Sequence, residues 1–169
     1  RSLDYGQECS FSLDGLEKNE PGWIEYVKGV AWALGQKHEL QGMEGVLAGD
    51  VPIGASLSSS AALEIAMVTA FAHFAGLDLD PGQAALLGQK AENQWVGMQC
   101  GIMDQMISAA GIAGHAMLLD CRTLERTMAP VPGDCQVVVM DTTTRRKLVE
   151  SAYNERRQQC EAGAAFFEK

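Results

Sequence analysis

The sequence is poor in the residues from which metal sites and disulfide frameworks are built. Its three histidines lie far apart, at His38, His73 and His115, so a histidine-built metal site is not expected. The five cysteines include no C-x-x-C pair and follow no regular spacing. An odd, scattered set of this kind is typical of reduced thiols in the cytosol, and we therefore expect a cytoplasmic protein.

Long apolar runs and positive charge are also scarce. No run approaches the roughly 18 apolar residues of a membrane span, and no basic-then-apolar leader opens the sequence. Thirteen Lys and Arg stand against 22 Asp and Glu, a net charge of −9, and Lys90 is the single basic residue between Lys37 and Arg122. Such a surface repels nucleic-acid backbones and anionic membranes. We therefore expect neither of them as a partner.

What the chain does contain is an ordinary globular composition. It has 169 residues, of which 47% are hydrophobic and 21% are charged. This composition excludes a disordered, collagen-like or coiled-coil chain, and the length suits one domain. Because the first residue is Arg1 rather than Met, we expect the sequence to be a piece of a longer protein.

Apolar spacing predicts helices and strands without strict alternation, which favours an α+β fold. Helix 61–75 is apolar on nearly every face, which predicts a buried central helix. A capping box at Asp80 and Gln83, with Pro81 between them, opens another helix that Gly97 can end. The full set of expected helices is 21–35, 61–75, 80–97, Asp104 to Gly111 and onward from about Leu148, and the expected strands are 43–51, 115–120 and 135–141.

The most informative segment is Gly49–Ala62, GDVPIGASLSSSAA, which joins a predicted strand to the buried helix. A helix N-terminus needs one capping hydroxyl, whereas four serines crowd this one: Ser56, Ser58, Ser59 and Ser60. The other hydroxyls and the free N–H groups of the first turn can seat an anion. A serine-rich cap on a tight turn is the alternative, but the surplus serines favour phosphate. The segment matches neither the Walker loop nor the G-x-S-x-G nucleophile elbow.

Charge predicts that a cation takes part in binding such a phosphate. No Lys or Arg lies between residues 38 and 89, so a polyphosphate would depend on backbone N–H groups, the helix dipole and a divalent cation. We therefore expect a requirement for Mg²⁺. Glu92 is a candidate oxygen ligand, and its alternative is an ordinary exposed glutamate.

Two further candidates come later in the chain. Asp104 follows a glycine at a predicted helix start, where it can cap the helix or accept a proton from a substrate hydroxyl. Tyr153 lies within a basic stretch that can be a solvated helix face or can contact a sugar or phosphate: Arg145, Arg146, Lys147, Arg156 and Arg157. Trp23, Trp32 and Trp95 are assigned to the core.

Three motifs in this order resemble those of the galactokinases, members of the GHMP superfamily of sugar, homoserine, mevalonate and phosphomevalonate kinases. The first motif, similar to the phosphate loop P-x-G-x-G-L-S-S-S-A, is Pro52-Ile-Gly54-Ala-Ser56-Leu57-Ser58-Ser59-Ser60-Ala61, with Ser56 at the position of the second glycine. The second comprises Lys90-Ala-Glu92-Asn93 and Cys100-Gly101-Ile102-Met103-Asp104-Gln105. The third runs from Arg145 to Arg157. The likeness covers nearly the whole chain.

The resemblance implies the GHMP-kinase fold, a mixed sheet with buried central helices like ribosomal protein S5 domain 2. Residues 1–141 would be most of the N-terminal ATP-binding domain, and residues 142–169 the beginning of the C-terminal domain. The implied reaction transfers the γ-phosphate of ATP to the C1 hydroxyl of galactose, giving galactose 1-phosphate and ADP.

The resemblance also implies roles for individual residues. Ser60 and Glu92 would bind Mg²⁺, and Asp104 would accept or orient the proton of the sugar hydroxyl. Gly101, Asp104 and Tyr153 would contact the sugar. The nucleotide phosphates would lie against Pro52, Gly54, Ser56, Leu57, Ser58, Ser59, Ser60 and Ala61.

Two galactokinase motifs are absent from the sequence: the opening G-R-V-N-L-I-G-E-H-x-D-Y segment and a glycine-rich motif near the end. Because the first supplies part of the sugar site, we expect the chain by itself to be inactive, and we expect a monomer. A sister kinase of arabinose or glucuronate is the nearest alternative. A non-catalytic sensor that binds galactose and ATP is the other alternative. The intact phosphate-loop motif at residues 52–61, called the serine loop below, disfavours a sensor, as do Glu92 and Asp104.

Overall fold

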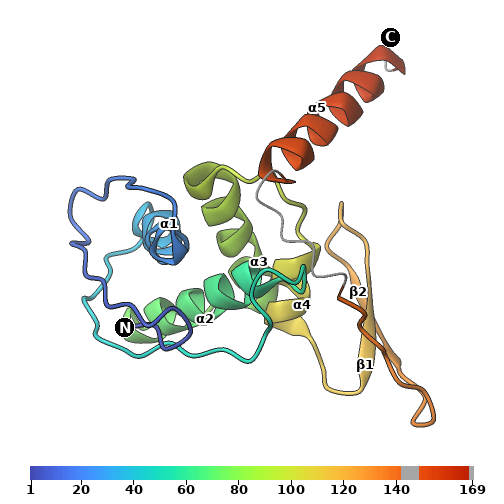
Figure 1. Cartoon of the computed structure of the whole chain (residues 1–169), viewed down its shortest axis with the longest axis horizontal. Coiled ribbons are helices and arrows are strands. Elements are labelled where there is room, and N and C mark those ends of the chain that lie inside the picture. Colours follow the sequence, from blue (N-terminus) through green and yellow to red (C-terminus); the bar gives the residue numbers. More distant parts are fainter. Residues whose placement is uncertain (142–148, 168–169) are drawn as a thin grey trace.

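The computed structural model describes residues 1–141 and 149–167, and the side chains of all of these except residues 149–152. Figure 1 shows a group of packed helices with a strand pair on one side and a helix that extends away from the group at the C-terminal end. Along the chain, the described elements are α1 (Trp23–Gly35), α2 (Ser59–Phe74), α3 (Pro81–Lys90), the π-helix η1 (Ala91–Val96), α4 (Met103–Ala110), β1 (His115–Leu119), β2 (Arg126–Pro130) and α5 (Val149–Phe167).

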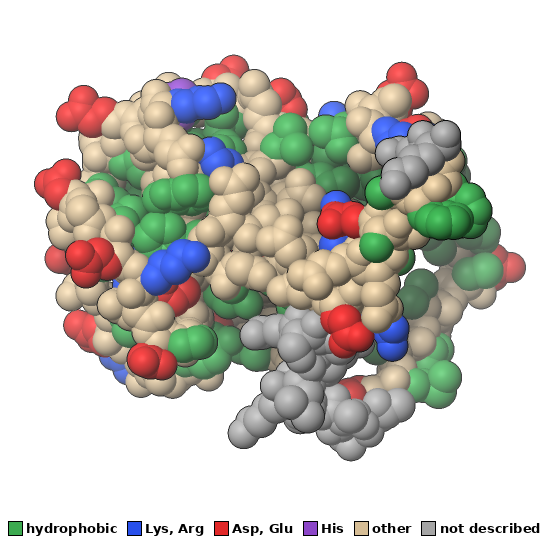
Figure 2. Space-filling view, turned by 90° about the horizontal axis from the view of Figure 1, so that it is seen from above, with side chains coloured by type: hydrophobic (Ala, Val, Ile, Leu, Met, Phe, Trp, Pro, Cys, Tyr) green, Lys and Arg blue, Asp and Glu red, His purple; other side chains and the backbone are tan. Residues whose placement is uncertain are grey.

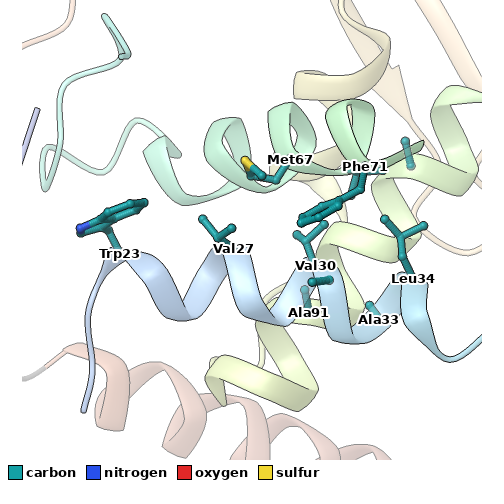
Figure 3. Close-up of a cluster of buried hydrophobic side chains, with 11 residues drawn as sticks. Trp23, Val27, Val30, Ala33, Leu34, Met67, Phe71 and Ala91 are labelled. Carbon is teal, nitrogen blue, oxygen red and sulfur yellow. The ribbon is translucent and has the colours of Figure 1, made fainter. Parts of the chain in front are cut away.

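The main core lies between α1 and α2. The predicted apolar stripe of α1 is buried, and Figure 3 shows Val27, Val30 and Leu34 pointing toward Met67 and Phe71 of α2. The prediction of a central second helix is confirmed, because α2 contacts α1, α3 and α4. This helix carries the serine loop at its N-terminal end, so core packing fixes the position of that loop.

A buried ion pair within α1 is hydrogen-bonded to η1. Lys28 Nζ lies 2.8 Å from Glu25 Oε1, and Trp95 Nε1 donates a hydrogen bond of 2.9 Å to Glu25 Oε2. Burial by itself would raise the pKa of Glu25, but the hydrogen bonds from Lys28 and Trp95 and the charge of Lys28 lower it below its usual value. The hydrogen bond from Trp95 to Glu25 therefore helps to hold η1, which carries Glu92, against α1.

The predicted helix 80–97 is confirmed, with one change of geometry. Asp80 Oδ1 accepts from the N–H groups of Gly82 and Gln83 at 2.7 and 3.1 Å, and Gln83 Oε1 accepts from Asp80 N at 3.0 Å. Gly97 ends the helix with a positive φ of 98°. The last six residues form a π-helical turn instead of an α-helical one. Such turns are rare and are frequently found at functional sites.

The strands differ most from prediction. Strand 115–120 is confirmed as β1, which pairs with β2 in an antiparallel register from His115–Pro130 to Leu119–Arg126. Strand β2 was not predicted, because residues around Pro130 are typical of turns. The α+β class is confirmed, and the sheet of the described residues is this antiparallel pair.

Two other predicted strands do not form. Within residues 43–51 a bridge joins Leu47 to Ser2, with no longer ladder. Residues 135–141 have no regular secondary structure, and Val137 and Met140 are each 86% exposed. A run rich in β-branched residues needs a neighbouring strand to become one, and none pairs with either segment within the part of the chain described.

The next features are the distribution of charge on the surface and the apolar length of the helices. Figure 2 shows acidic and basic side chains dispersed over the described residues of one face, without a continuous basic patch there. Among the helices within residues 1–141 and 149–167, none is both long enough and apolar enough to cross a membrane.

Candidate active site

A cavity of about 920 Å³ opens where the serine loop, the start of α2, η1, the start of α4 and α5 meet. Most of the residues that the sequence singled out line it: Gly54, Ser56, Ser58, Ser59, Ser60, Glu92, Gly101, Asp104 and Tyr153. Pro52, Leu57 and Ala61 are not among the lining residues, although they belong to the same loop and helix start. Residues far apart in the sequence are thus brought to one cavity.

The serine loop has an unusual backbone. Gly54, Ser56 and Ser58 all have positive φ angles, of 74°, 60° and 62°. Alternation of left-handed with ordinary residues turns successive N–H groups toward a common concave side, which is an anion-binding arrangement. Ser56 adopts a conformation that costs an L-residue about 1–2 kcal/mol, which accounts for glycine at this position of the galactokinase motif.

The serine hydroxyls are not used to cap α2. Ser58 occupies the N-cap position, and its side chain makes no capping hydrogen bond. The first-turn N–H groups of a helix have no acceptor within the helix itself. The Ser58 hydroxyl and the helix N-terminus are therefore both available to a ligand in the cavity, which supports phosphate binding over the alternative of a serine-rich cap.

Glu92 lies beside the serine loop and is not an ordinary exposed glutamate. It is 6% exposed, and its carboxylate accepts a hydrogen bond from the side chain of Ser60. One carboxylate and one hydroxyl form a donor set that Mg²⁺ accepts when substrate phosphates and water complete its shell. The residues present therefore fit the metal that the sequence predicts. The lining contains no Lys or Arg among the described residues.

Behind Glu92 lies a buried polar cluster that sequence analysis missed. Gln105, on α4, donates to Glu92 Oε2 at 2.6 Å and to Glu64 Oε2 at 3.0 Å. Cys100 Sγ donates to Glu92 Oε2 at 3.1 Å. Glu64 and Gln105 are both fully buried. The signal that could have found the cluster is Glu64 itself, the one acidic residue in the mostly apolar sequence of α2.

Burial sets the charge state of this cluster. Desolvation, followed by the charge of Glu92, raises the pKa of Glu64 from 4.5 to about 9, although the hydrogen bond from Gln105 opposes the shift. Desolvation also raises the pKa of Glu92, against hydrogen bonds from Cys100, Ser60 and Gln105. Burial and the same carboxylate raise the pKa of the Cys100 thiol, which is therefore a hydrogen-bond donor at neutral pH.

Asp104 faces the cavity from the first turn of α4. The helix begins at Met103 with Ile102 as its N-cap residue, so Asp104 is not the cap that was its alternative assignment. Its side chain is half-buried and lines the cavity. A carboxylate in a first helical turn also interacts favourably with the helix dipole.

Tyr153 reaches the cavity from α5, which is anchored by its neighbour Asn154. Asn154 Oδ1 accepts from Gln99 N at 2.9 Å, and Asn154 Nδ2 donates to Gly97 O at 3.0 Å. Arg157 pairs with Glu161 on the exposed surface of α5, which is the solvated-face arrangement. Arg145, Arg146 and Lys147 lie outside the described residues.

The lining of the cavity also includes aromatic residues. Tyr5, Trp23 and Tyr26 line it, and the rings of Tyr5 and Trp23 stack with their centroids 6.1 Å apart. Trp23 is only 7% exposed, so its assignment to the core is confirmed, but it also forms part of the wall. Tyr5 and Tyr26 gave no sequence signal because they belong to no recognised motif.

Comparisons with known proteins identify the family of the chain. Residues 25–112, just over half of the chain, match the N-terminal domain of the GHMP kinases. The crystal structure of Lactococcus lactis galactokinase complexed with galactose is similar, with a TM-score of 0.71 and 34% sequence identity. The match covers 86% of this chain and 39% of that galactokinase. The chain belongs to the GHMP kinase family.

Proposed function

We propose that the cavity is the ATP and sugar site of a galactokinase, which transfers the γ-phosphate of ATP to the C1 hydroxyl of galactose. The observation that carries the proposal is the convergence of the serine loop, Glu92, Asp104 and Tyr153 on one hollow. Similarity to a galactokinase that was crystallised with galactose supports the choice of sugar. Because the chain spans 39% of that protein, we expect activity from the full-length protein and not from the chain by itself.

In the proposed reaction, the serine loop binds the phosphates and Asp104 acts on the sugar. The N–H groups around Gly54, Ser56 and Ser58 would hold the phosphates, and the absence of Lys and Arg from the described lining makes backbone donors the main protein contribution there. Asp104 would orient the C1 hydroxyl of the sugar and accept its proton as the oxygen attacks phosphorus. Such transfers depend mainly on positioning and charge stabilisation.

Ser60 and Glu92 would hold Mg²⁺, which, when bound, would neutralise the charge of the phosphates. Replacement of Glu92 by Gln removes the anionic ligand. In the full-length protein, E92Q should raise the Mg²⁺ concentration that gives half-maximal rate by about tenfold or more. Even mutation of a group that only hydrogen-bonds to a metal ligand typically weakens metal binding on that scale. A Mg²⁺ titration of the initial rate measures this. E44Q, at an exposed position away from the cavity, is the control, and an unchanged titration for E92Q would reject Glu92 as a ligand.

Tyr153 should act on the sugar and not on the nucleotide. Tyr153→Phe removes one hydroxyl, and the loss of one hydrogen bond of about 0.5–1.5 kcal/mol should raise the KM for galactose roughly three- to tenfold. The KM for ATP should stay as in the wild type. Y5F, which removes the hydroxyl of another tyrosine in the cavity lining, should not change the KM for galactose. If Y153F changed the KM for galactose and the KM for ATP equally, or changed neither, Tyr153 would have only a packing role.

Sugar-dependent release of ADP by the full-length protein tests the proposed reaction. Galactose should support the highest kcat/KM, well above arabinose and glucuronate. A preference for one of those sugars would identify the sister kinase. Binding of galactose and ATP without ADP release would identify the sensor. The predictions of a cytoplasmic location, a monomer and a domain boundary at residue 141 stay predictions.

A further inference from the structure

Two successive residues of α4 face opposite ways at the active site. Asp104 lines the cavity, whereas Gln105 is fully buried beneath it. The side-chain amide of Gln105 does not face substrate. It nevertheless donates a hydrogen bond to Glu92, the proposed metal ligand, and can therefore influence the metal site.

The amide nitrogen of Gln105 donates to the carboxyl groups of two glutamates. Nε2 donates to Glu92 Oε2 at 2.6 Å and to Glu64 Oε2 at 3.0 Å. These partners come from η1 and α2, so one amide from α4 joins the three elements that form the metal side of the cavity. Glu64 also lies four residues after Ser60, on the same face of α2.

Packing restricts the Gln105 side chain to this position. Gly88 of α3 lies against it so closely that an added Cβ would sit 3.2 Å from Gln105 Cγ and 3.5 Å from Glu64 Cβ. A larger residue at position 88 would therefore press on the pair. A side chain enclosed in this way holds its hydrogen bonds in one geometry.

The cluster is an unfavourable arrangement for stability alone. Glu64 Oε1 and Gln105 Oε1 are buried and have no hydrogen-bond partner among the described residues. Each unsatisfied buried polar atom costs about 1–3 kcal/mol, and apolar side chains of similar shape would avoid that cost. A function for the amide explains why glutamine and glutamate stand here.

We propose that Gln105 is a positioning residue that holds the Glu92 carboxylate in the orientation in which it binds Mg²⁺, with Glu64 fixing the Gln105 amide in turn. The inference rests on the proposed function, in which Glu92 is a metal ligand. Gln105 and Cys100 both donate to Oε2 of Glu92, which leaves Oε1 free of these two donors. Mutation of a residue that hydrogen-bonds to a metal ligand typically weakens metal binding about 10- to 100-fold.

The test is direct binding of Mn²⁺ to the full-length protein in the presence of ADP, followed by electron spin resonance. Gln105→Met keeps the volume and removes the amide. It should weaken Mn²⁺ binding about 10- to 100-fold, and the affinity for ADP without metal should be unchanged. Gln105→Asn withdraws the amide by one methylene, should weaken Mn²⁺ binding in the same direction, and serves in place of Q105M if that variant does not fold.

Gln89→Leu is the matched control. Gln89 is a partly buried glutamine on α3 whose Nε2 donates to Cys100 O at 3.2 Å and not to Glu92, so Q89L should bind Mn²⁺ like the wild type. If the folded Gln105 variants bind Mn²⁺ as tightly as the wild type while E92Q binds it weakly, the positioning role is wrong and the metal site stands. If E92Q also leaves Mn²⁺ binding unchanged, both this inference and the assigned metal site are wrong.

Discussion

Asp104→Asn should lower the kcat of the full-length protein at least about a hundredfold, the usual scale for a positioned proton acceptor. The amide keeps the shape of the side chain, but it can no longer take the proton of the sugar hydroxyl. Because Asp104 lies in the first turn of α4 and not in the serine loop, the dissociation constant for ATP should change little. Steady-state kinetics and nucleotide titration measure the two quantities separately.

Asp50→Asn is the matched control for this experiment. Asp50 also lines the cavity, but it precedes the serine loop and is exposed. D50N should therefore retain most of the kcat. Undiminished turnover in D104N would remove Asp104 from the mechanism, and equal losses in both variants would indicate a general effect of cavity charge.

The second large effect is a dependence of stability on pH that comes from Glu64. Its pKa is raised from 4.5 to about 9, so between these values the folded state holds a proton that the unfolded state has released. The folded state then binds more protons than the unfolded state, and the free energy of unfolding falls as pH rises, by up to about 1.4 kcal/mol per pH unit. This contribution is fully present below pH 4.5 and is lost as pH rises through about 9.

Glu64→Gln isolates that contribution, because glutamine resembles the protonated acid and does not titrate. The difference in unfolding free energy between wild type and E64Q should move in favour of E64Q as pH rises from 6 to 9. Urea unfolding at each pH measures it. E44Q, at an exposed position, should follow the wild type. Parallel curves for wild type and E64Q would show that Glu64 is ionised in the folded protein.

Local signals in the sequence predicted most of the helical framework. The capping box at Asp80, the terminal Gly97 and the apolar stripe of α1 depend on neighbouring residues alone, and all three are confirmed. The serine loop was found because its composition exceeds what a cap needs. Its alternating left-handed backbone was not predicted, because serine gives no sign of a positive φ.

Features that depend on distant contacts were missed or wrong. Gln105 and Glu64 are 41 residues apart, and nothing in the spacing of either indicates that they meet. The π-helical turn of η1 breaks a pattern that reads as continuous α-helix. The run 135–141 has the composition of a strand, but composition cannot supply the neighbour that a strand requires.

In the proposed complex, one cavity holds the phosphates against the serine loop and the sugar against Asp104. A crystal structure of the full-length protein with MgADP and galactose tests it most directly. We expect the ADP phosphates to lie against Gly54, Ser56 and Ser58, and the C1 hydroxyl of galactose to lie within hydrogen-bond reach of Asp104, about 2.6–3.2 Å. Galactose bound elsewhere, or bound with its C1 hydroxyl turned away from Asp104, would contradict it.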